Sequence, residues 1–169
     1  MLKVLTIIFL FISTVSADVP SNYSDLPAVN GKVVKVSNIN SLYKAISGLK
    51  SNTSIIISKG IYKLNKPLNI PKGLANIAIR GATGKFEDVV IEGAGMNNKA
   101  VWHGIMINNA QKILIADLTI SKVGFHPITA SSGSESIHVY HCRLLDAGEQ
   151  FIKVNSGKGE GSDNGKVEY

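Results

Sequence analysis

The sequence predicts an all-β protein, a parallel β-helix in which the chain winds as a solenoid behind one short amino-terminal capping α-helix. Three observations predict this fold. After Ser54 the chain consists of brief β-branched runs separated by Gly, Asn, Lys and Ser. Similar runs return at an interval of about 24 residues. Only residues 41–49 show the apolar periodicity of an amphipathic helix.

Composition limits the class of protein. The chain has 169 residues, a formal net charge of +6, 44% hydrophobic residues and one cysteine. This size suits a single domain with a core, and the hydrophobic content excludes a disordered chain. One cysteine excludes an intramolecular disulfide scaffold and a cysteine-based zinc site. Arginine occurs only at Arg80 and Arg143, which argues against nucleic acid as a partner.

Residues 1–17 are predicted to be a signal peptide. Lys3 provides a positive charge, residues 4–15 form an apolar run, and Val15-Ser16-Ala17 matches the small-residue cleavage pattern. The run is shorter than the roughly 20 apolar residues that a membrane-spanning helix needs. A retained anchor helix is the alternative. We therefore expect a secreted or periplasmic protein, cut after Ala17, with no membrane contact after cleavage.

Residues 18–40 are predicted to form an irregular lead-in that contains one short strand, residues 32–36. Residues 41–169 then form the β-helix, which begins with the capping helix at 41–49. In that helix Leu42, Ala45, Ile46 and Leu49 fall on one face. Asn40 or Ser41 can cap its start, and Gly48 lies near its end. The apolar face must cover a core, so we expect this helix to close the first coil.

The repeat favours a solenoid over a sandwich or a barrel. The segments that align are residues 103–105, 126–128 and 150–152; residues 89–91, 113–115 and 137–139; and residues 118–120 and 142–144. Each interval of about 24 residues corresponds to one coil, and successive coils stack their strands about 4.8 Å apart. The alignment predicts an inward column of Ile105, Ile128 and Ile152. The neighbouring outward columns are Met106, Thr129 and Lys153; Thr119 and Arg143; and Leu114 and His138.

The opening of the β-helix resembles the pectin-lyase-like superfamily. The resemblance rests on the cap helix at residues 41–46, the strand that ends Gly60-Ile61-Tyr62, and the strands that end in Arg80-Gly81 and in Gly93. It implies a secreted, right-handed, single-stranded parallel β-helix. The superfamily includes polysaccharide lyases, glycoside hydrolases, tail spikes and adhesins, so fold alone does not assign an activity.

The resemblance implies candidate residues for β-elimination of a uronate. Such a reaction needs a cation beside the carboxylate and a base of suitable pKa. Lys153 and Arg143 are expected to be basic, outward and on neighbouring coils, and Glu149 lies in the turn between them, so these three residues are the candidate catalytic set. His138 and Trp102 are the candidate substrate-binding residues. Solvated surface residues are the structural alternative for Lys153 and Arg143, and coverage of a strand end is the alternative for Trp102.

Other polar residues are expected to have structural roles. His103 and His126 share a column with Gln150, either as two bases or ligands about 5 Å apart or as a polar column at a turn. Asp117 and His141 share a turn column and are predicted to form a hydrogen bond. Cys142 is predicted to be a small core residue.

No metal ligands are assigned from the sequence. Calcium is the cation that lyases of this superfamily often use, and it would need converging acidic groups. The closest approach to such a cluster is Glu160 with Asp163 and Asn164. This glycine-rich segment, residues 157–165, is more simply an insertion that lengthens its coil by about six residues relative to the repeat.

Two functions remain open. The first is a polysaccharide lyase that cleaves an acidic, uronate-containing polysaccharide, and the second is a non-catalytic surface or adhesive β-helix that binds glycan or protein. Residues 167–169 resemble the start of a further strand. We therefore expect this sequence to be the front part of a longer or truncated chain. The alternative is association through the open last coil, whose strand edges would be unpaired.

Overall fold

The computed structural model describes residue 26 and residues 31–98, 100–157 and 161–168. The predicted signal peptide at residues 1–17 lies outside these described residues, and so do residues 18–25 and 27–30 of the predicted lead-in, whereas its predicted strand at residues 32–36 is present. Within them, no helix has both the length and the hydrophobicity that spanning a bilayer requires.

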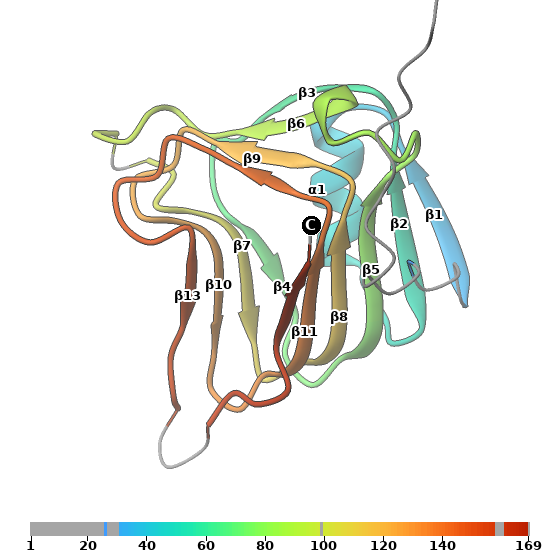
Figure 1. Ribbon diagram of the computed structural model, residues 1–169. Helices are drawn as coiled ribbons and strands as arrows, with labels where there is room; N and C mark the ends of the chain where they lie inside the picture. The colour runs from blue at the N-terminus through green and yellow to red at the C-terminus, as the bar shows by residue number, and fades with distance from the viewer. Residues whose placement is uncertain (1–25, 27–30, 99, 158–160, 169) are drawn as a thin grey trace, which may run out of the picture.

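The described chain forms three parallel sheets, one helix and one 3₁₀ turn (Figure 1). Sheet A contains six strands, which are β1 (Lys32–Val36), β2 (Thr53–Ile57), β5 (Ala75–Gly81), β8 (Gln111–Ala116), β11 (Glu135–Tyr140) and β14 (Lys166–Glu168). Sheet B contains β3 (Gly60–Lys63), β6 (Val89–Glu92), β9 (Thr119–Ser121) and β12 (Arg143–Leu144). Sheet C contains β4 (Leu68–Ile70), β7 (His103–Asn108), β10 (His126–Ser131) and β13 (Ile152–Val154). The helix is α1 (Ile39–Ser47), and the 3₁₀ turn is η1 (Phe86–Asp88).

The chain visits the three sheets in turn, which is the path of a parallel β-helix. From β7 onward each strand is followed by a strand in the next sheet, in the order C, A, B. Every strand pair in the described residues is parallel, and Ile128 lies opposite Ile105 on one side and Ile152 on the other. The predicted inward column and the three predicted outward columns are therefore confirmed in register.

One predicted alignment is wrong. Residues 89–91 were expected one coil before residues 113–115, but Val90 pairs with Thr119 in sheet B, and Ile113 pairs with Ile77 in sheet A. The cause is the length of this coil. It carries η1 and the loop that follows β6, so a constant interval of about 24 residues fails to mark the strand register there.

The capping helix begins two residues earlier than predicted. Its N-cap is Asn38, whose side-chain oxygen accepts a hydrogen bond from the Ser41 amide at 2.9 Å, while the Ser41 hydroxyl accepts one from the Asn38 amide at 3.2 Å. This reciprocal pair is a capping box. At the other end the Gly48 amide donates to the carbonyl of Lys44. The prediction of Asn40 or Ser41 as the cap is therefore wrong, because Ser41 acts as the third helical residue instead.

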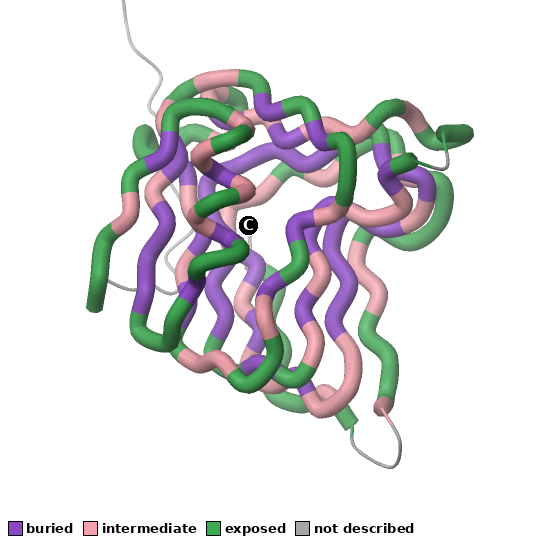
Figure 2. Tube along the Cα trace, turned by 180° about the vertical axis from the view of Figure 1, so that it is seen from behind, coloured by how far each residue is buried: buried purple, intermediate pink, exposed green. Residues whose placement is uncertain are grey.

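Stacked aliphatic side chains form the core between the three sheets. The buried residues recur along the strands (Figure 2). Ile55, Ile79, Ile115 and Val139 occupy one position on successive strands of sheet A and are almost wholly buried. Burial of each such side chain contributes about 1.5–3 kcal/mol. Leu42 and Ile46 of α1 join the same core. Since the interior is filled by these columns, the outer faces of the sheets are where binding chemistry can lie.

Candidate functional site

The outer face of sheet A carries the candidate site. Side chains alternate between the two faces of a strand, so the residues between the buried isoleucines point outward. One outward column contains Ser54, Ala78, Leu114, His138 and Lys166. The next contains Ile56, Arg80, Ala116, Tyr140 and Glu168. The first column lines a groove of 390 Å³ that crosses successive rungs of the sheet.

A histidine–carboxylate pair lies at this groove. Nε2 of His138 is 2.7 Å from a carboxylate oxygen of Glu168, and Nζ of Lys166 is 2.6 Å from the other oxygen. The Glu168 side chain is 9% exposed and the His138 side chain 18%. Because a carboxylate only accepts, Nε2 of His138 carries the shared hydrogen. In the neutral ring Nδ1 is then the nitrogen that accepts a proton.

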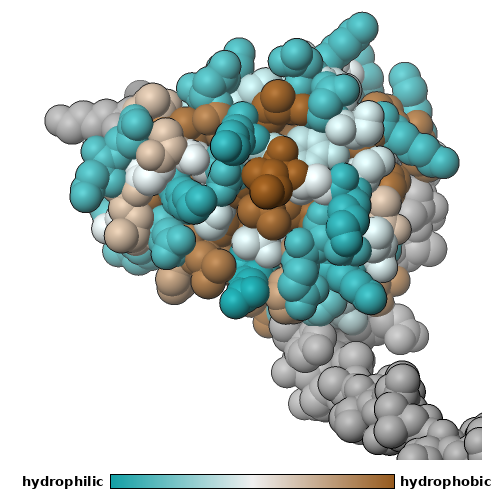
Figure 3. Space-filling view, turned by 90° about the horizontal axis from the view of Figure 1, so that it is seen from above, coloured by the Kyte–Doolittle hydropathy of each residue, from teal (hydrophilic) through white to brown (hydrophobic). Residues whose placement is uncertain are grey.

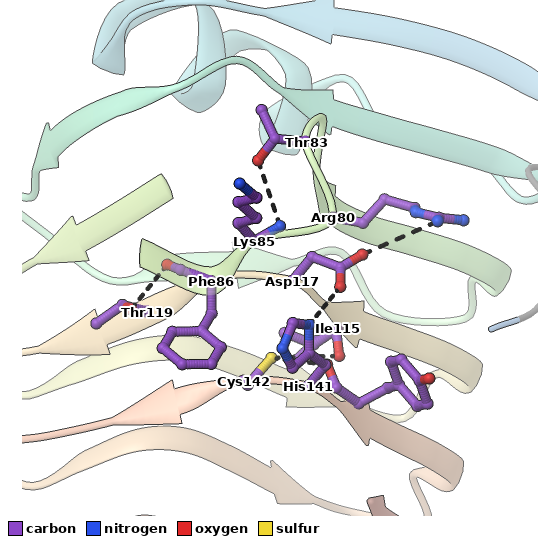
Figure 4. A network of polar contacts seen from close by, with 10 residues as sticks. Arg80, Thr83, Lys85, Phe86, Ile115, Asp117, Thr119, His141 and Cys142 are labelled. Carbon is purple, nitrogen blue, oxygen red and sulfur yellow. Dashed lines mark hydrogen bonds and ion pairs between the residues drawn. The ribbon is translucent and has the colours of Figure 1, made fainter. Parts of the chain in front are cut away.

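A second histidine–carboxylate pair lies at the corner where sheet A meets sheet B (Figure 4). Nδ1 of His141 is 2.9 Å from Oδ1 of Asp117, which confirms the predicted hydrogen bond between these residues. The Asp117 side chain is 4% exposed, and its second oxygen is 3.9 Å from the guanidinium of Arg80. The buried charge of Asp117 is therefore compensated by the hydrogen bond from His141 and by the nearby positive charge of Arg80, while its Oδ2 has no hydrogen-bond partner among the described residues.

Tyr140 stands between the two pairs on the last residue of β11. Its ring centroid is 5.8 Å from the ring of His138 and 6.4 Å from the ring of His141, and both contacts are edge-to-face. The carboxyl end of one strand thus presents an imidazole, a phenol and a second imidazole in succession. Cationic side chains, Arg80 and Lys166, lie on the same outward face.

Three predicted catalytic residues lie on other parts of the molecule. Lys153 is on β13 of sheet C, opposite Thr129. Arg143 is on β12 of sheet B, with its guanidinium 5.8 Å from the centre of the Phe86 ring. Glu149 lies in the turn that leads to β13, with a carboxylate oxygen 3.5 Å from Nε2 of His126. The structure does not bring these three residues together on one sheet.

The two predicted substrate-binding residues have different surroundings. His138 lines the groove described above. Trp102 precedes β7 and packs against Phe125, with ring centroids 4.1 Å apart. Trp102 therefore covers the start of two neighbouring strands of sheet C, on a different part of the molecule from the groove.

The outer face of sheet B has a different character. Seen from above, it presents an apolar area surrounded by hydrophilic side chains (Figure 3). Ile61 is the exposed apolar residue of β3. The basic residues here have acidic partners: Lys59 pairs with Asp88 at 2.7 Å, and Lys122 pairs with Glu92 at 2.8 Å. These cations of sheet B are therefore paired with carboxylates, as Lys166 of sheet A is.

The described residues contain neither a group of side chains placed to bind a metal ion nor a reactive thiol. No group of three or more His, Cys, Asp or Glu side chains in them is placed to hold a metal ion. Glu160, from the predicted oxygen-rich segment, lies outside the described residues. Cys142 points into the core, as predicted, and burial raises the pKa of its thiol to about 12. A thiol with so high a pKa stays protonated and is a poor nucleophile.

A stacked pair of histidines marks the corner between sheets B and C. The rings of His103 and His126 lie 5.2 Å apart at 21°, as the shared column predicted. Nδ1 of His126 is 3.0 Å from the carbonyl oxygen of Gln150, whereas Nδ1 of His103 is buried and has no hydrogen-bond partner in the described part of the chain. Burial lowers the pKa of His103 below its ordinary value of 6.5. The charge of His126 lowers it further, and Glu149 opposes the shift.

This lowered pKa predicts acid sensitivity. The folded state holds His103 neutral, while the unfolded chain binds a proton there below about pH 6.5, so the free energy of unfolding should fall as the pH drops below that value. His103→Gln should make the fall shallower, because glutamine already occupies this column at Gln150. Urea unfolding of both proteins between pH 5 and pH 8 measures the two slopes. Equal slopes would contradict the assignment to His103.

Several functional candidates were missed by the sequence analysis. Arg80, Tyr140, Lys166 and Glu168 share the outward face of His138, and alternation along β5 and β11 could have identified the first two. Lys166 and Glu168 could not be placed in this way, because the insertion at residues 157–165 changes the interval between coils and the repeat no longer predicts which residues they pair with. His138 pairs with Lys166 across this insertion, which lengthens the coil by less than the six residues expected.

Comparison with known proteins supports the fold. No protein-family model matches the chain, and no curated protein matches it significantly. Among solved structures, a variant of the PL6 family alginate lyase AlyGC matches with a TM-score of 0.52 and 17% identity, over 88% of this chain and 21% of that chain. A second AlyGC structure matches over 88% of this chain and 26% of that chain, with 18% identity and a TM-score of 0.34. This chain spans about a fifth of the length of the first neighbour. It is therefore similar in fold to a polysaccharide lyase with a parallel β-helix.

Proposed function

We propose that this protein is a right-handed, single-stranded β-helix that binds an acidic, uronate-containing polysaccharide on the outer face of sheet A and cleaves it by β-elimination. The observation that carries the proposal is the groove of 390 Å³ lined by His138 and Lys166, with Tyr140 and Arg80 on the adjacent outward column. The fold likeness to a PL6 family alginate lyase supports the reaction class.

The residues of this face can supply each part of the elimination. Lys166 and Arg80 offer positive charge to the uronate carboxylate and so stabilise the anion that forms beside it. Nδ1 of His138 takes the proton from the carbon α to that carboxylate. The electron pair of the broken C–H bond forms a carbon–carbon double bond and expels the glycosidic oxygen, which takes a proton from the Tyr140 hydroxyl. Glu168 holds the His138 ring in place and stabilises its charged form.

Product formation tests the proposal. The full chain is incubated with alginate, pectate and chondroitin, with and without calcium, and the ultraviolet absorbance of the unsaturated product is followed. Absorbance should rise with at least one of these polymers. Lys153→Ala and Arg143→Ala should keep the activity, because these residues lie on other sheets; loss of activity in both variants would move the site to sheets B and C. Binding without any product would favour the non-catalytic, glycan-binding alternative.

Export of the protein is part of the same proposal. The predicted signal at residues 1–17 would direct the protein out of the cytoplasm, as a secreted or periplasmic protein that acts on an extracellular polysaccharide. Amino-terminal sequencing of the exported protein should begin at Asp18. A mature protein that retains residues 1–17 would contradict the predicted cleavage.

A further inference from the structure

One backbone position repeats in five coils at the edge of the groove. It lies within two residues of the start of a strand of sheet A and has a left-handed backbone in each of these coils. Its residues are Asn52 (φ 60°), Asn76 (φ 58°), Lys112 (φ 53°), Ser136 (φ 53°) and Asn164 (φ 56°). The register of the flanking residues places them in one column, since Gln111 pairs with both Ala75 and Glu135. All of them except Asn52 line the groove.

Asparagine is the residue that this position favours. It tolerates the left-handed region better than other residues with a Cβ atom, which makes the backbone strain small. It also bonds along the column: the Asn76 side-chain amide donates to the side-chain oxygen of Asn52 at 2.8 Å. Lys112 and Ser136 interrupt this ladder. A lysine here has neither advantage, so its presence calls for another reason.

The other left-handed lysine has a structural reason, and Lys112 does not share it. Lys122 (φ 57°) forms an ion pair with Glu92 at 2.8 Å. Among the described residues, no acidic side chain forms an ion pair with Lys112, which is exposed at the groove. Strained backbone conformations that no contact within the protein compensates are found preferentially at binding sites.

We infer that Lys112 is a ligand-recognition residue that binds the anionic group of the glycan in the groove, and that the protein keeps it there against the preference of its backbone position. This inference rests on the proposed function. Lys112 belongs to the rung of β8, His138 to that of β11 and Lys166 to that of β14. With rungs about 4.8 Å apart, the two lysines lie on either side of the rung of His138, about 10 Å apart along the axis of the β-helix, and Lys112 is also displaced by two residues along its strand. A polyanionic chain lying across the rungs meets a cation on each side of the proposed base.

Lys112→Asn tests the inference, and Ser136→Asn is the matched control. Both variants restore asparagine to the column, so each should raise the Tm by about 2–4 °C. Only Lys112→Asn removes a charge. Its dissociation constant for an alginate oligosaccharide, measured by titration calorimetry at low salt, should rise about three- to fivefold, and the difference should vanish at high salt. Ser136→Asn is the control for the Tm alone, because Ser136 also lines the groove, and Lys112→Arg should keep the affinity without the gain in Tm.

The outcomes separate this inference from the proposed function. Unchanged affinity in Lys112→Asn, while the wild type binds and cleaves the glycan, would overturn only the role of Lys112. A Tm that does not rise in Lys112→Asn would show that the position carries no strain and would also overturn the inference. A wild-type protein that binds no acidic glycan, with dextran as the neutral control, would overturn both proposals.

Discussion

Replacement of His138 with alanine is expected to lower kcat for the elimination by about 100-fold or more, which is the usual contribution of a positioned general base. The geometry behind this expectation is the pairing with Glu168. The short contact at Nε2 fixes the ring and leaves Nδ1 as the nitrogen that accepts the substrate proton. KM should change less than kcat, because the cations of the groove remain. Initial rates of unsaturated product formation measure the effect.

Two further variants separate catalysis from folding. Glu168→Gln keeps an oxygen that accepts the His138 hydrogen bond but removes the negative charge that stabilises the imidazolium. Its kcat should fall, by less than in His138→Ala. His103→Gln removes a histidine at a distant corner and should keep kcat at neutral pH. If His138→Ala keeps the wild-type kcat with an unchanged circular dichroism spectrum, His138 is not the base.

The periodic part of the fold could be predicted from the sequence. Stacked coils place like side chains over one another, so the repeated isoleucines Ile105, Ile128 and Ile152 predict a single inward column. The same alternation places Thr129 and Lys153 on the opposite face of their strands. Such predictions succeed because each depends only on neighbouring coils of equal length, and β7 to β13 satisfy that condition.

Insertions and the helix start were less predictable. The turn η1 and the loop after β6 lengthen one coil. For this reason the repeat alignment assigned residues 89–91 to the strand column of residues 113–115 in sheet A, although they belong to sheet B. The helix start was misplaced because several polar residues in succession can act as the N-cap. Only the reciprocal hydrogen bonds of Asn38 and Ser41 distinguish the true one.

The candidate site was predicted only in part, for a geometric reason. Alternation shows that Lys153, Arg143 and His138 point outward, and all three do lie in outward columns. It does not show that the three sheets of a β-helix face three different directions. Residues from successive strands of the chain therefore separate, while residues one coil apart converge, as Asp117 and His141 do. A site on stacked parallel sheets is assembled along columns, so knowledge of sheet membership is needed in addition to burial.

Replacement of Gly81 with alanine is expected to destabilise the protein strongly. A Cβ atom at Gly81 would lie 2.1 Å from the backbone oxygen of Asp117, on the next coil. Backbone atoms cannot move aside as a flexible side chain can, so the two coils must separate locally. We expect the free energy of unfolding to fall by at least about 4 kcal/mol. For a chain of this size that corresponds to a drop in Tm of roughly 8–16 °C.

The local separation of the two coils in Gly81→Ala would also displace residues of the candidate site. This variant therefore tests the register of sheet A and the geometry of the site together. Asp117 rests on Gly81 and holds His141, while Arg80 immediately before the glycine approaches the second oxygen of Asp117. Gly165→Ala is the matched control, because a Cβ atom there meets only the Ile137 carbonyl at 3.8 Å and should change stability by no more than about 0.5 kcal/mol. Thermal unfolding followed by circular dichroism compares the variants. A Gly81→Ala protein as stable as the control would mean that Gly81 and Asp117 are not stacked, and the register of sheet A at this corner would have to be abandoned.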